Sequence, residues 1–243
     1  MNLIIDIGNS STKISVFRED TEVYSARWIQ LNYKELSKIL DDYNPDYGII
    51  SCVGQFNRDL VKNLEKKLKE LILMNPSTLL PFTNKYKTRE TLGNDRLAGV
   101  AGALQLYPAE NILIIDAGTA ITYDILTDSG EYIGGNISPG LQMRYTALNN
   151  QTRNLPLLNP EERWENIGST TSSAIIAGVQ NGIIFEIDNT IEMIMEQFVN
   201  LKTIVTGGDA GFFDNKLKKP IFVISNLISV GLNSILKYNV ENR

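Results

Sequence analysis

Leu113-Ile-Ile-Asp-Ala-Gly-Thr119 repeats, almost letter for letter, the earlier stretch Leu3-Ile-Ile-Asp-Ile-Gly-Asn9. Each copy is an apolar, β-branched run that stops at an acid and a glycine, which is typical of a buried strand followed by a turn. Strand-like sequence follows each copy, at residues 13–17 and 121–126. The repeat therefore predicts two related α/β halves, each opening with a β-hairpin whose tip carries Asp and Gly. Two such tips facing each other across a cleft would hold a polyphosphate and its cation.

Strand and helix patterns alternate through the rest of the chain, which favours an α/β fold in each half. Strand patterns cover residues 3–6, 13–17, 22–28, 47–53, 113–116, 121–126, 130–140 and 203–206, and helical patterns cover 32–43, 57–73, 97–107, 139–155, 172–199 and 222–238. We expect an N-terminal domain at residues 1–109 and a C-terminal domain at residues 110–243. The helix at 97–107 is rich in Gly and Ala, which would allow close approach by another backbone.

The composition excludes several kinds of site. The chain has 243 residues, a formal net charge of -5, one cysteine and no histidine. Without histidine, Ser-His-Asp triads and histidine-containing zinc sites are excluded, so a general base at neutral pH must be a carboxylate or a less usual group. Cys52 lies in an apolar run and is interpreted as a core residue rather than a nucleophile.

The sequence also bears on the compartment and on large partners. Met1 leads straight into a strand, without the basic segment and cleavage site of a signal peptide. No apolar run reaches the roughly 18 residues that a membrane span needs. A single cysteine cannot form an intrachain disulfide, which suits a reducing compartment. These features lead us to expect a cytoplasmic protein that does not bind membranes. Because the basic residues are dispersed, we also expect no nucleic-acid partner.

The turn after the first strand is rich in hydroxyl and amide groups and ends in a cation. It consists of Asp6, Ile7, Gly8, Asn9, Ser10, Ser11, Thr12 and Lys13. Backbone N–H groups at such a turn can cradle phosphate oxygens, and glycine allows close approach. The chain contains no Gly-x-x-x-x-Gly-Lys-[Ser/Thr] loop. A lone Asp-x-Gly would be a weak signal, but two copies at one fixed offset favour phosphate or nucleotide binding.

Three acids have both a structural and a functional interpretation. Asp6 and Asp116 either accept N–H bonds within their own turns or bind cations, which prefer oxygen ligands. Gly93-Asn-Asp-Arg96 places an acid beside a cation at the start of a helix. Asp95 is then either a helix cap paired with Arg96, or a base that accepts a proton from a hydroxyl while Arg96 grips an anionic group. Tyr86 either lines the same pocket or packs.

Together these motifs resemble those of the type III pantothenate kinases. The matching motifs, which follow the family's order and approximate spacing over essentially the whole chain, are Asp6-Ile-Gly-Asn-Ser10, Gly93-Asn-Asp-Arg96, Asp116-Ala-Gly-Thr119, Gly134-Gly-Asn-Ile-Ser-Pro-Gly140 and Thr206-Gly-Gly-Asp-Ala210. That family belongs to the actin, chaperone and sugar-kinase ATPase superfamily. The resemblance therefore implies an α/β fold of two related ribonuclease-H-like (actin-like ATPase) domains with a central cleft, which accounts for the internal repeat.

The resemblance implies an activity and a set of site residues. The activity is ATP-dependent phosphorylation of pantothenate to 4'-phosphopantothenate, the first step of coenzyme A biosynthesis. By resemblance, ATP binds to the segment from Asp6 to Lys13 and also to Thr119. Asp95 matches the catalytic base that takes the proton from the primary hydroxyl of pantothenate. The positions that match pantothenate contacts are Tyr86, Gly93, Asn94, Asp95, Arg96 and Thr171.

The resemblance also implies cofactors and a partner subunit. ATP would bind with Mg²⁺, and Asp116 matches a ligand for a monovalent cation, K⁺ or NH₄⁺. The family forms homodimers with sites near the interface. The small-residue helix after Arg96 and the region of Thr171 are therefore the candidate interface surfaces.

Some positions depart from the family pattern, and other functions compete. Arg89 stands where the family usually has Pro, Ser10 stands where Thr is frequent, and Arg153 stands where Ala is common. None removes a group that the reaction needs, although Arg89 affects the expected shape of the substrate lid. The alternatives are a kinase for another small alcohol such as a sugar, a non-catalytic nucleotide-binding regulator, and a filament-forming actin-like protein.

Overall fold

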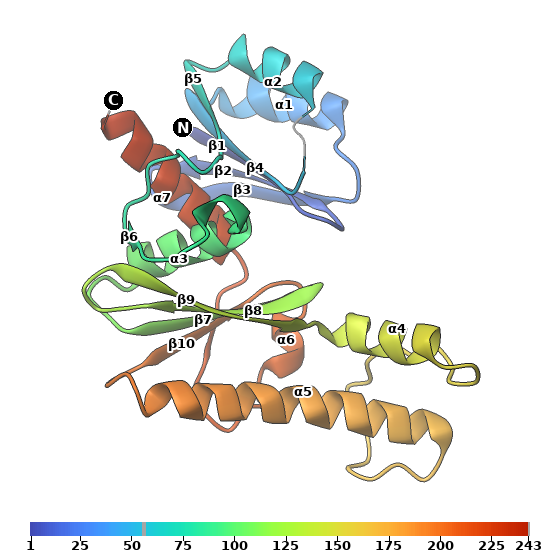
Figure 1. The fold of residues 1–243 in the computed structure, drawn as a ribbon. Coiled ribbons are helices and arrows are strands. Elements are labelled where there is room, and N and C mark those ends of the chain that lie inside the picture. The colour runs from blue at the N-terminus through green and yellow to red at the C-terminus, as the bar shows by residue number, and fades with distance from the viewer. Residues whose placement is uncertain (55–56, 243) are drawn as a thin grey trace. The chain divides into compact units, whose positions relative to one another are not determined.

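The computed structural model describes residues 1–54 and 57–242 (Figure 1). The chain divides into two compact units, one formed by Met1–Pro108 with Asn226–Arg243 and the other by Ala109–Ser225. The first change of unit falls beside the boundary predicted between residues 109 and 110. The C-terminal segment differs from the prediction, because it returns to the first unit instead of completing the second.

The first unit is built on a mixed sheet with the strand order β3-β2-β1-β4-β5. Its strands are β1 (Asn2–Ile7), β2 (Thr12–Arg18), β3 (Thr21–Trp28), β4 (Tyr47–Cys52) and β5 (Glu70–Leu73). β1, β2 and β3 pair antiparallel, whereas β4 pairs parallel with β1 and β5. The hairpin of β1 and β2 thus leads into a parallel arrangement through crossover helices.

Helices cover both faces of this sheet (Figure 1). On one face, apolar side chains of β1 and β2 pack with α1 (Tyr33–Tyr43) and α2 (Arg58–Glu65). The other face meets α7 (Leu227–Glu241), as the bond from Asn2 Nδ2 to Asn233 Oδ1 at 2.8 Å shows. Between β5 and α3 (Asn94–Leu106) the chain forms only the short strand β6 (Thr83–Asn84) and a 3-10 turn at Arg89–Thr91.

The predicted close approach at the Gly- and Ala-rich helix is confirmed, and its partner is α7 of the same chain. A Cβ added at Gly102 would lie 2.4 Å from the carbonyl oxygen of Leu227, and one added at Gly231 would lie 1.7 Å from that of Ala98. Only glycine fits at such distances. The expectation that this helix forms a dimer interface is wrong for its small residues, because 96–103 are buried within the chain.

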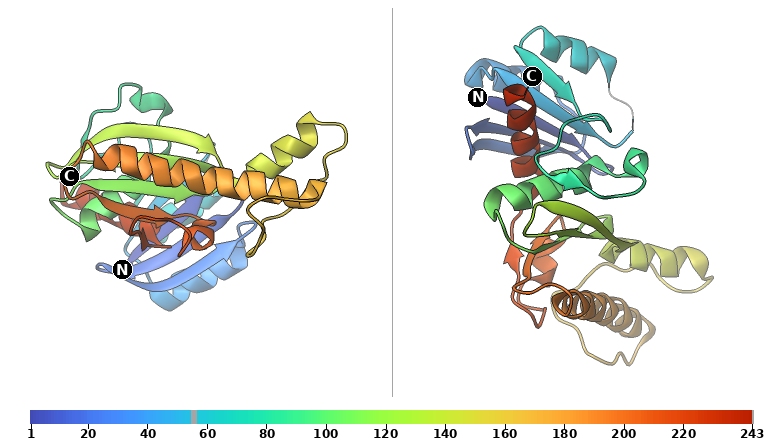
Figure 2. Two further views of the ribbon diagram at one scale, coloured as in Figure 1. Left: turned by 90° about the horizontal axis from the view of Figure 1, so that it is seen from below. Right: turned by 60° about the vertical axis from the view of Figure 1, so that its left-hand side comes forward.

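The second unit repeats this plan with the strand order β11-β10-β7-β8-β9. Its strands are β7 (Ile112–Ala117), β8 (Ala120–Leu126), β9 (Glu131–Pro139), β10 (Lys202–Thr206) and β11 (Phe222–Val223). The long helix α5 (Thr171–Met195) runs along one face of the sheet (Figure 2), where Ile183, Ile187 and Ile191 enter the core. α4 (Leu141–Gln151) continues from β9, and α6 (Ala210–Phe213) follows β10.

Two predicted helices are wrong in part, because tertiary strand pairing overrides local periodicity. Residues 57–73 carry leucines at helical spacing, yet α2 ends at Glu65, and β5 continues the sheet with Glu70 opposite Tyr47. The predicted helix at 222–238 begins later, at Leu227. Its first residues form β11 instead, where Phe222 pairs with Ile204 of β10.

Candidate active site

The turn between β1 and β2 is exposed at its tip and holds its shape through its own backbone. Gly8 N donates to Ser11 O at 3.0 Å, and Gly8, Asn9 and Ser10 are exposed. A Cβ added at Gly8 would lie 3.3 Å from the same Ser11 oxygen, so the turn is tight. Exposed backbone N–H groups at such a tip are suited to phosphate oxygens.

A row of polar side chains crosses the sheet at the base of this turn. Asp6 pairs in register with Lys13 of β2 and with Ser51 of β4, and Lys13 pairs with Arg27 of β3. Residues directly opposite in register share one face of a sheet. That face is the one toward α7, since Ser15 Oγ, two residues from Lys13, lies 3.2 Å from Ser229 Oγ.

Burial shapes the charges in this row. Burial raises the pKa of Asp6, as does the negative charge of Asp95, and the hydrogen bond with Ser51 and the charges of Lys13 and Arg27 only partly offset this. Burial also lowers the pKa of the Lys13 ammonium, against the attraction of Glu22 and Asp6. A raised pKa on an acid and a lowered one on a base in one place are typical of functional sites.

The start of α3 brings Asp95 toward the same row. Gly93 is the N-cap residue, and Asp95 Oδ1 accepts a hydrogen bond from Arg96 N at 2.8 Å. A Cβ added at Gly93 would lie 2.3 Å from Asp95 Oδ1, so the absence of a side chain there makes room for the carboxylate. Asp6 and Asp95 both belong to the first compact unit, and the negative charge of Asp95 adds to the raised pKa of Asp6.

Tyr86 and Arg96 form one contact, with the guanidinium carbon 5.4 Å from the centre of the tyrosine ring. Arg96 is buried, with 7% of its surface exposed. Asn84 fixes the approach to this pair, because its side-chain oxygen accepts from Tyr86 N at 2.9 Å and its carbonyl accepts from Arg89 Nη2 at 2.6 Å. Arg89, the residue that departs from the family pattern, therefore anchors the segment that carries Tyr86.

The register of strand pairing in the hairpin of β7 and β8 differs by one residue from that in the hairpin of β1 and β2. Thr12 and Thr122 stand at the same position in the two copies of the sequence repeat. Asp116 pairs with Thr122, whereas Asp6 pairs with Lys13, so these two threonines do not occupy equivalent places in the hairpins. A shift of one residue moves side chains to the other face of a strand. Thr122 therefore takes the place that Lys13 has in the first hairpin, and the second turn has no lysine at this position.

Glycine allows another strand end to approach Asp116. Gly207 has φ 97° and follows β10, and a Cβ added there would lie 2.4 Å from Asp116 Oδ1. Asp209 N, just beyond, donates to Ala117 O at 2.9 Å, and burial raises the pKa of the Asp209 carboxyl. Thr119 is exposed at the tip of this turn. Asp116, Gly207 and Asp209 thus gather at one end of the second sheet.

Thr171 lies in the second unit, whereas the other residues predicted to bind pantothenate lie in the first. It is the first residue of α5, and Thr170 caps that helix through a bond from Ser173 N to its hydroxyl at 3.1 Å. Thr171 lines a cavity of about 690 Å³ between α4 and α5. The walls of this cavity are mainly apolar, and Arg144 also lines it.

Three polar partners of the site were not predicted. Ser51, Arg27 and Glu22 act on Asp6 or Lys13 from β4 and β3. Their sequence surroundings carry no motif, because their role depends on which strands pair and in what register. Only the strand predictions at 22–28 and 47–53 could have suggested them.

The donor set suits a cation that is shared with a ligand. Among residues 1–54 and 57–242, no group of three or more His, Cys, Asp or Glu side chains is arranged to hold a metal ion. Asp6 and Asp116 each present a carboxylate beside a turn suited to phosphate. Mg²⁺ in nucleotide sites is typically held by one or two carboxylates together with substrate phosphates. Taken separately, each carboxylate fits a metal that arrives with a nucleotide.

Comparisons with known proteins identify a family. The model of the family described as type III pantothenate kinase matches residues 2–193. A type III pantothenate kinase of Christiangramia forsetii is 42% identical over 243 residues, covering 98% of this chain and 99% of the relative.

Two solved structures share the fold at lower identity. A Baf family transcriptional activator from Campylobacter jejuni has a TM-score of 0.58 and 24% identity, covering 98% of this chain and 99% of that one. A glucokinase from an Antarctic psychrotroph has a TM-score of 0.54 and 10% identity, covering 98% of each chain. The predicted fold class, α/β with the duplicated plan of sugar kinases and actin-like ATPases, is confirmed. No helix in the described part of the chain has both the length and the apolar character of a membrane span.

Proposed function

This chain belongs to the type III pantothenate kinase family, and on that premise we propose that it transfers the terminal phosphoryl group of ATP to pantothenate, the first step of coenzyme A biosynthesis. The product is 4'-phosphopantothenate. The observation that best supports a catalytic role for the predicted residues is that Asp95, in the first turn of α3, and the candidate phosphate turn that begins at Asp6 belong to one compact unit. The negative charge of Asp95 also contributes to the raised pKa of Asp6.

Asp95 is the catalytic base in this proposal. Its carboxylate accepts the proton from the primary hydroxyl of pantothenate as that oxygen bonds to the γ-phosphorus and ADP leaves. Phosphoryl transfer has a loose transition state, so positioning and charge neutralisation supply most of the rate, and the base acts late. A carboxylate suits this task in a chain without histidine.

The ATP-binding residues are the turn from Asp6 to Lys13 and Thr119. The backbone N–H groups of the exposed residues Asn9 and Ser10 bind phosphate oxygens, and Lys13 supplies a positive charge beside Asp6. The nucleotide is accompanied by a divalent metal, as in kinases generally, and we assign it as Mg²⁺, which neutralises phosphate charge when bound. Asp116, close to Gly207, binds the monovalent cation, K⁺ or NH₄⁺.

The pantothenate-binding residues are Tyr86, Gly93, Asn94, Asp95, Arg96 and Thr171. Arg96, held over the Tyr86 ring, offers a fixed guanidinium fork for the pantothenate carboxylate. Gly93 leaves space for the Asp95 carboxylate. A homodimer formed through the apolar cavity between α4 and α5 would bury the surface beside Thr171. We place the enzyme in the cytoplasm, where its substrates are present.

The test is ADP release from ATP with pantothenate, with and without K⁺, for the native chain and for Asp95→Asn. We expect K⁺-dependent turnover that falls at least about 100-fold in Asp95→Asn, as expected for a positioned base. Turnover that survives the substitution would remove Asp95 as an essential base. A folded protein that binds ATP but releases no ADP with pantothenate would favour a regulator or another small-alcohol substrate.

A further inference from the structure

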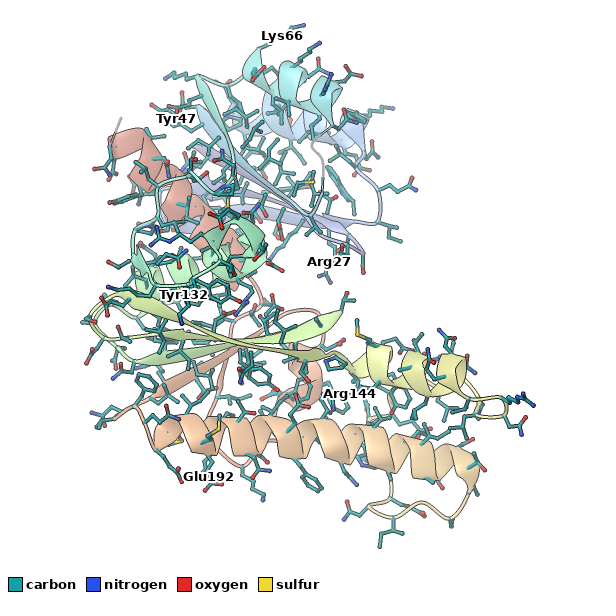
Figure 3. All side chains as sticks on the ribbon, viewed as in Figure 1. Arg27, Tyr47, Lys66, Tyr132, Arg144 and Glu192 are labelled. Carbon is teal, nitrogen blue, oxygen red and sulfur yellow. The ribbon has the colours of Figure 1, made fainter. Side chains whose placement is uncertain are left out.

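A polar network in the second unit ties four elements together beside the turn that carries Thr119. Arg144, in the first turns of α4, donates from Nε to Pro139 O at 2.9 Å and from Nη2 to Ser138 Oγ at 3.1 Å. The same Nη2 lies 2.6 Å from Glu186 Oε2 on α5. Tyr123 of β8 donates from its hydroxyl to Glu186 Oε1 at 2.9 Å. Figure 3 labels Arg144 where β9 passes into α4.

Hydrogen bonds and neighbouring charges fix the protonation states of Glu186 and Tyr123 in this network. Burial acts to raise the pKa of Glu186, but hydrogen bonds from Arg144, Ser138 and Tyr123 outweigh burial and leave that pKa lowered. Burial and the negative charge of Glu186 raise the pKa of Tyr123, so its hydroxyl keeps its proton and stays a donor. Glu186 is therefore ionised at neutral pH and accepts hydrogen bonds from three elements, α4, β9 and β8.

The end of β9, which this network holds, contacts the turn that carries Gly118 and Thr119. β8 and β9 pair as far as Ala120 opposite Pro139, and then Gly140 N donates to Thr119 O at 3.1 Å. A Cβ added at Gly140 would lie 2.2 Å from Gly118 O and 2.4 Å from Thr119 O, so the two backbones are in direct contact. A displacement of residues 138–140 would thus move Gly118 and Thr119.

Two of the usual local constraints are absent at the corner between residues 138 and 141. Pro139 has no N–H to donate, and no side chain caps α4 at Gly140. The carbonyl of Gly140 accepts from Arg144 N at 3.1 Å, so Arg144 holds the corner through its backbone as well as its guanidinium. Planar guanidinium groups fix geometry where a flexible ammonium would not.

We propose that Arg144 and Glu186 are positioning residues for the nucleotide- and cation-binding turn at 116–119. The inference rests on the proposed function of Thr119 and Asp116. Neither residue touches substrate in this account. They hold the end of β9 against Gly118 and Thr119, so their loss should weaken the response to ATP and K⁺ while leaving the pantothenate sites of the first unit unchanged.

The primary variant is Glu186→Gln, because Arg144 also lines the cavity near Thr171. We expect an increase of about tenfold in both the KM for ATP and the K⁺ concentration for half-activation, with an unchanged KM for pantothenate. The matched control is Glu192→Gln on the same helix, because Glu192 is exposed and its side chain pairs with Lys219 at 3.6 Å. The control should leave all three constants unchanged.

A double-mutant cycle tests whether the pair acts as a unit. Arg144→Met should raise the KM for ATP at least as much as Glu186→Gln, and the double variant should be no worse than Arg144→Met alone. Tyr123→Phe, which removes one donor to Glu186, should give a smaller increase of about threefold. If Arg144→Met fails to fold, the Glu186 and Tyr123 variants still decide the question.

The outcomes separate this inference from the proposed function. If the native enzyme is active and Glu186→Gln changes all three constants equally, or none, the positioning role is wrong. If the native chain shows no pantothenate-dependent ADP release, the proposed function fails. ATP dissociation constants from calorimetry in K⁺ buffer, without pantothenate, then test the positioning role alone. An unchanged constant in Glu186→Gln would overturn it.

Discussion

Replacing Gly93 with alanine should impair catalysis while leaving the fold nearly unchanged. The backbone at Gly93, with φ -61° and ψ 137°, suits alanine. The new Cβ, however, would lie 2.3 Å from Asp95 Oδ1, the atom that accepts from Arg96 N. Ordinary carbon–oxygen contact requires a separation about 1 Å larger, so the carboxylate must rotate away and lose that bond.

The expected loss follows from this displacement. A misplacement of about 1 Å at a reacting group can cost about 100-fold in rate, equivalent to about 2.7 kcal/mol in the activation barrier. Stability should change by less than about 1 kcal/mol, because the weaker N-cap and the reduced freedom of the unfolded chain act in opposite directions.

The assay is steady-state ADP release with saturating ATP, pantothenate and K⁺, together with the melting temperature. Gly182→Ala is the matched control, since a Cβ there meets no atom within 4 Å beyond the backbone of its own helix. We expect a kcat loss of about 100-fold in Gly93→Ala only. Native kcat in a folded Gly93→Ala protein would refute the requirement for this carboxylate position.

Three further substitutions have definite expected outcomes. Asp6→Asn should abolish turnover but raise the melting temperature at pH 7, because burial disfavours the ionised carboxylate of Asp6. Since the pKa of Asp6 in the folded protein is raised above the ordinary 3.8, the gain in melting temperature should vanish as the pH falls below about 4. Equal melting temperatures of the variant and the native chain at pH 7 would contradict this prediction. Arg89→Ala should raise the KM for pantothenate about threefold, because it removes the hydrogen bond from Arg89 to Asn84 O. A pantothenate titration that gives an unchanged KM would show that this bond is unimportant for substrate binding. Gly231→Ala should lower stability by about 1–3 kcal/mol through its clash with Ala98 O, which thermal melting can check against the native chain.

The repeated motif predicted the centre of each sheet because it combines a local signal with a chemical one. Both copies are buried strands, β1 and β7, and each delivers its acid, Asp6 or Asp116, to the strand end. Asp95 lies in the first turn of α3, as the helix-start pattern indicated. These features depend on contiguous sequence, so they can be predicted without knowledge of the fold.

Features that depend on pairing between distant segments could not be predicted. The leucine spacing at 57–73 is equally compatible with a helix and with a helix followed by a strand, and only the edge of β4 decides for β5. The one-residue difference in strand register between the two hairpins cannot be read from the repeated sequence. The return of α7 to the first unit likewise depends on Gly231 meeting α3.

The most direct test of the central claim is product analysis with ATP labelled with ¹⁸O on the γ-phosphate. The purified enzyme is incubated with labelled ATP, Mg²⁺, K⁺ and pantothenate. The products are then separated, and their masses are measured by mass spectrometry. We predict that pantothenate gains one labelled phosphoryl group in the native reaction, and that Asp95→Asn forms this product at least about 100-fold more slowly. Consumption of ATP with unmodified pantothenate would contradict the account.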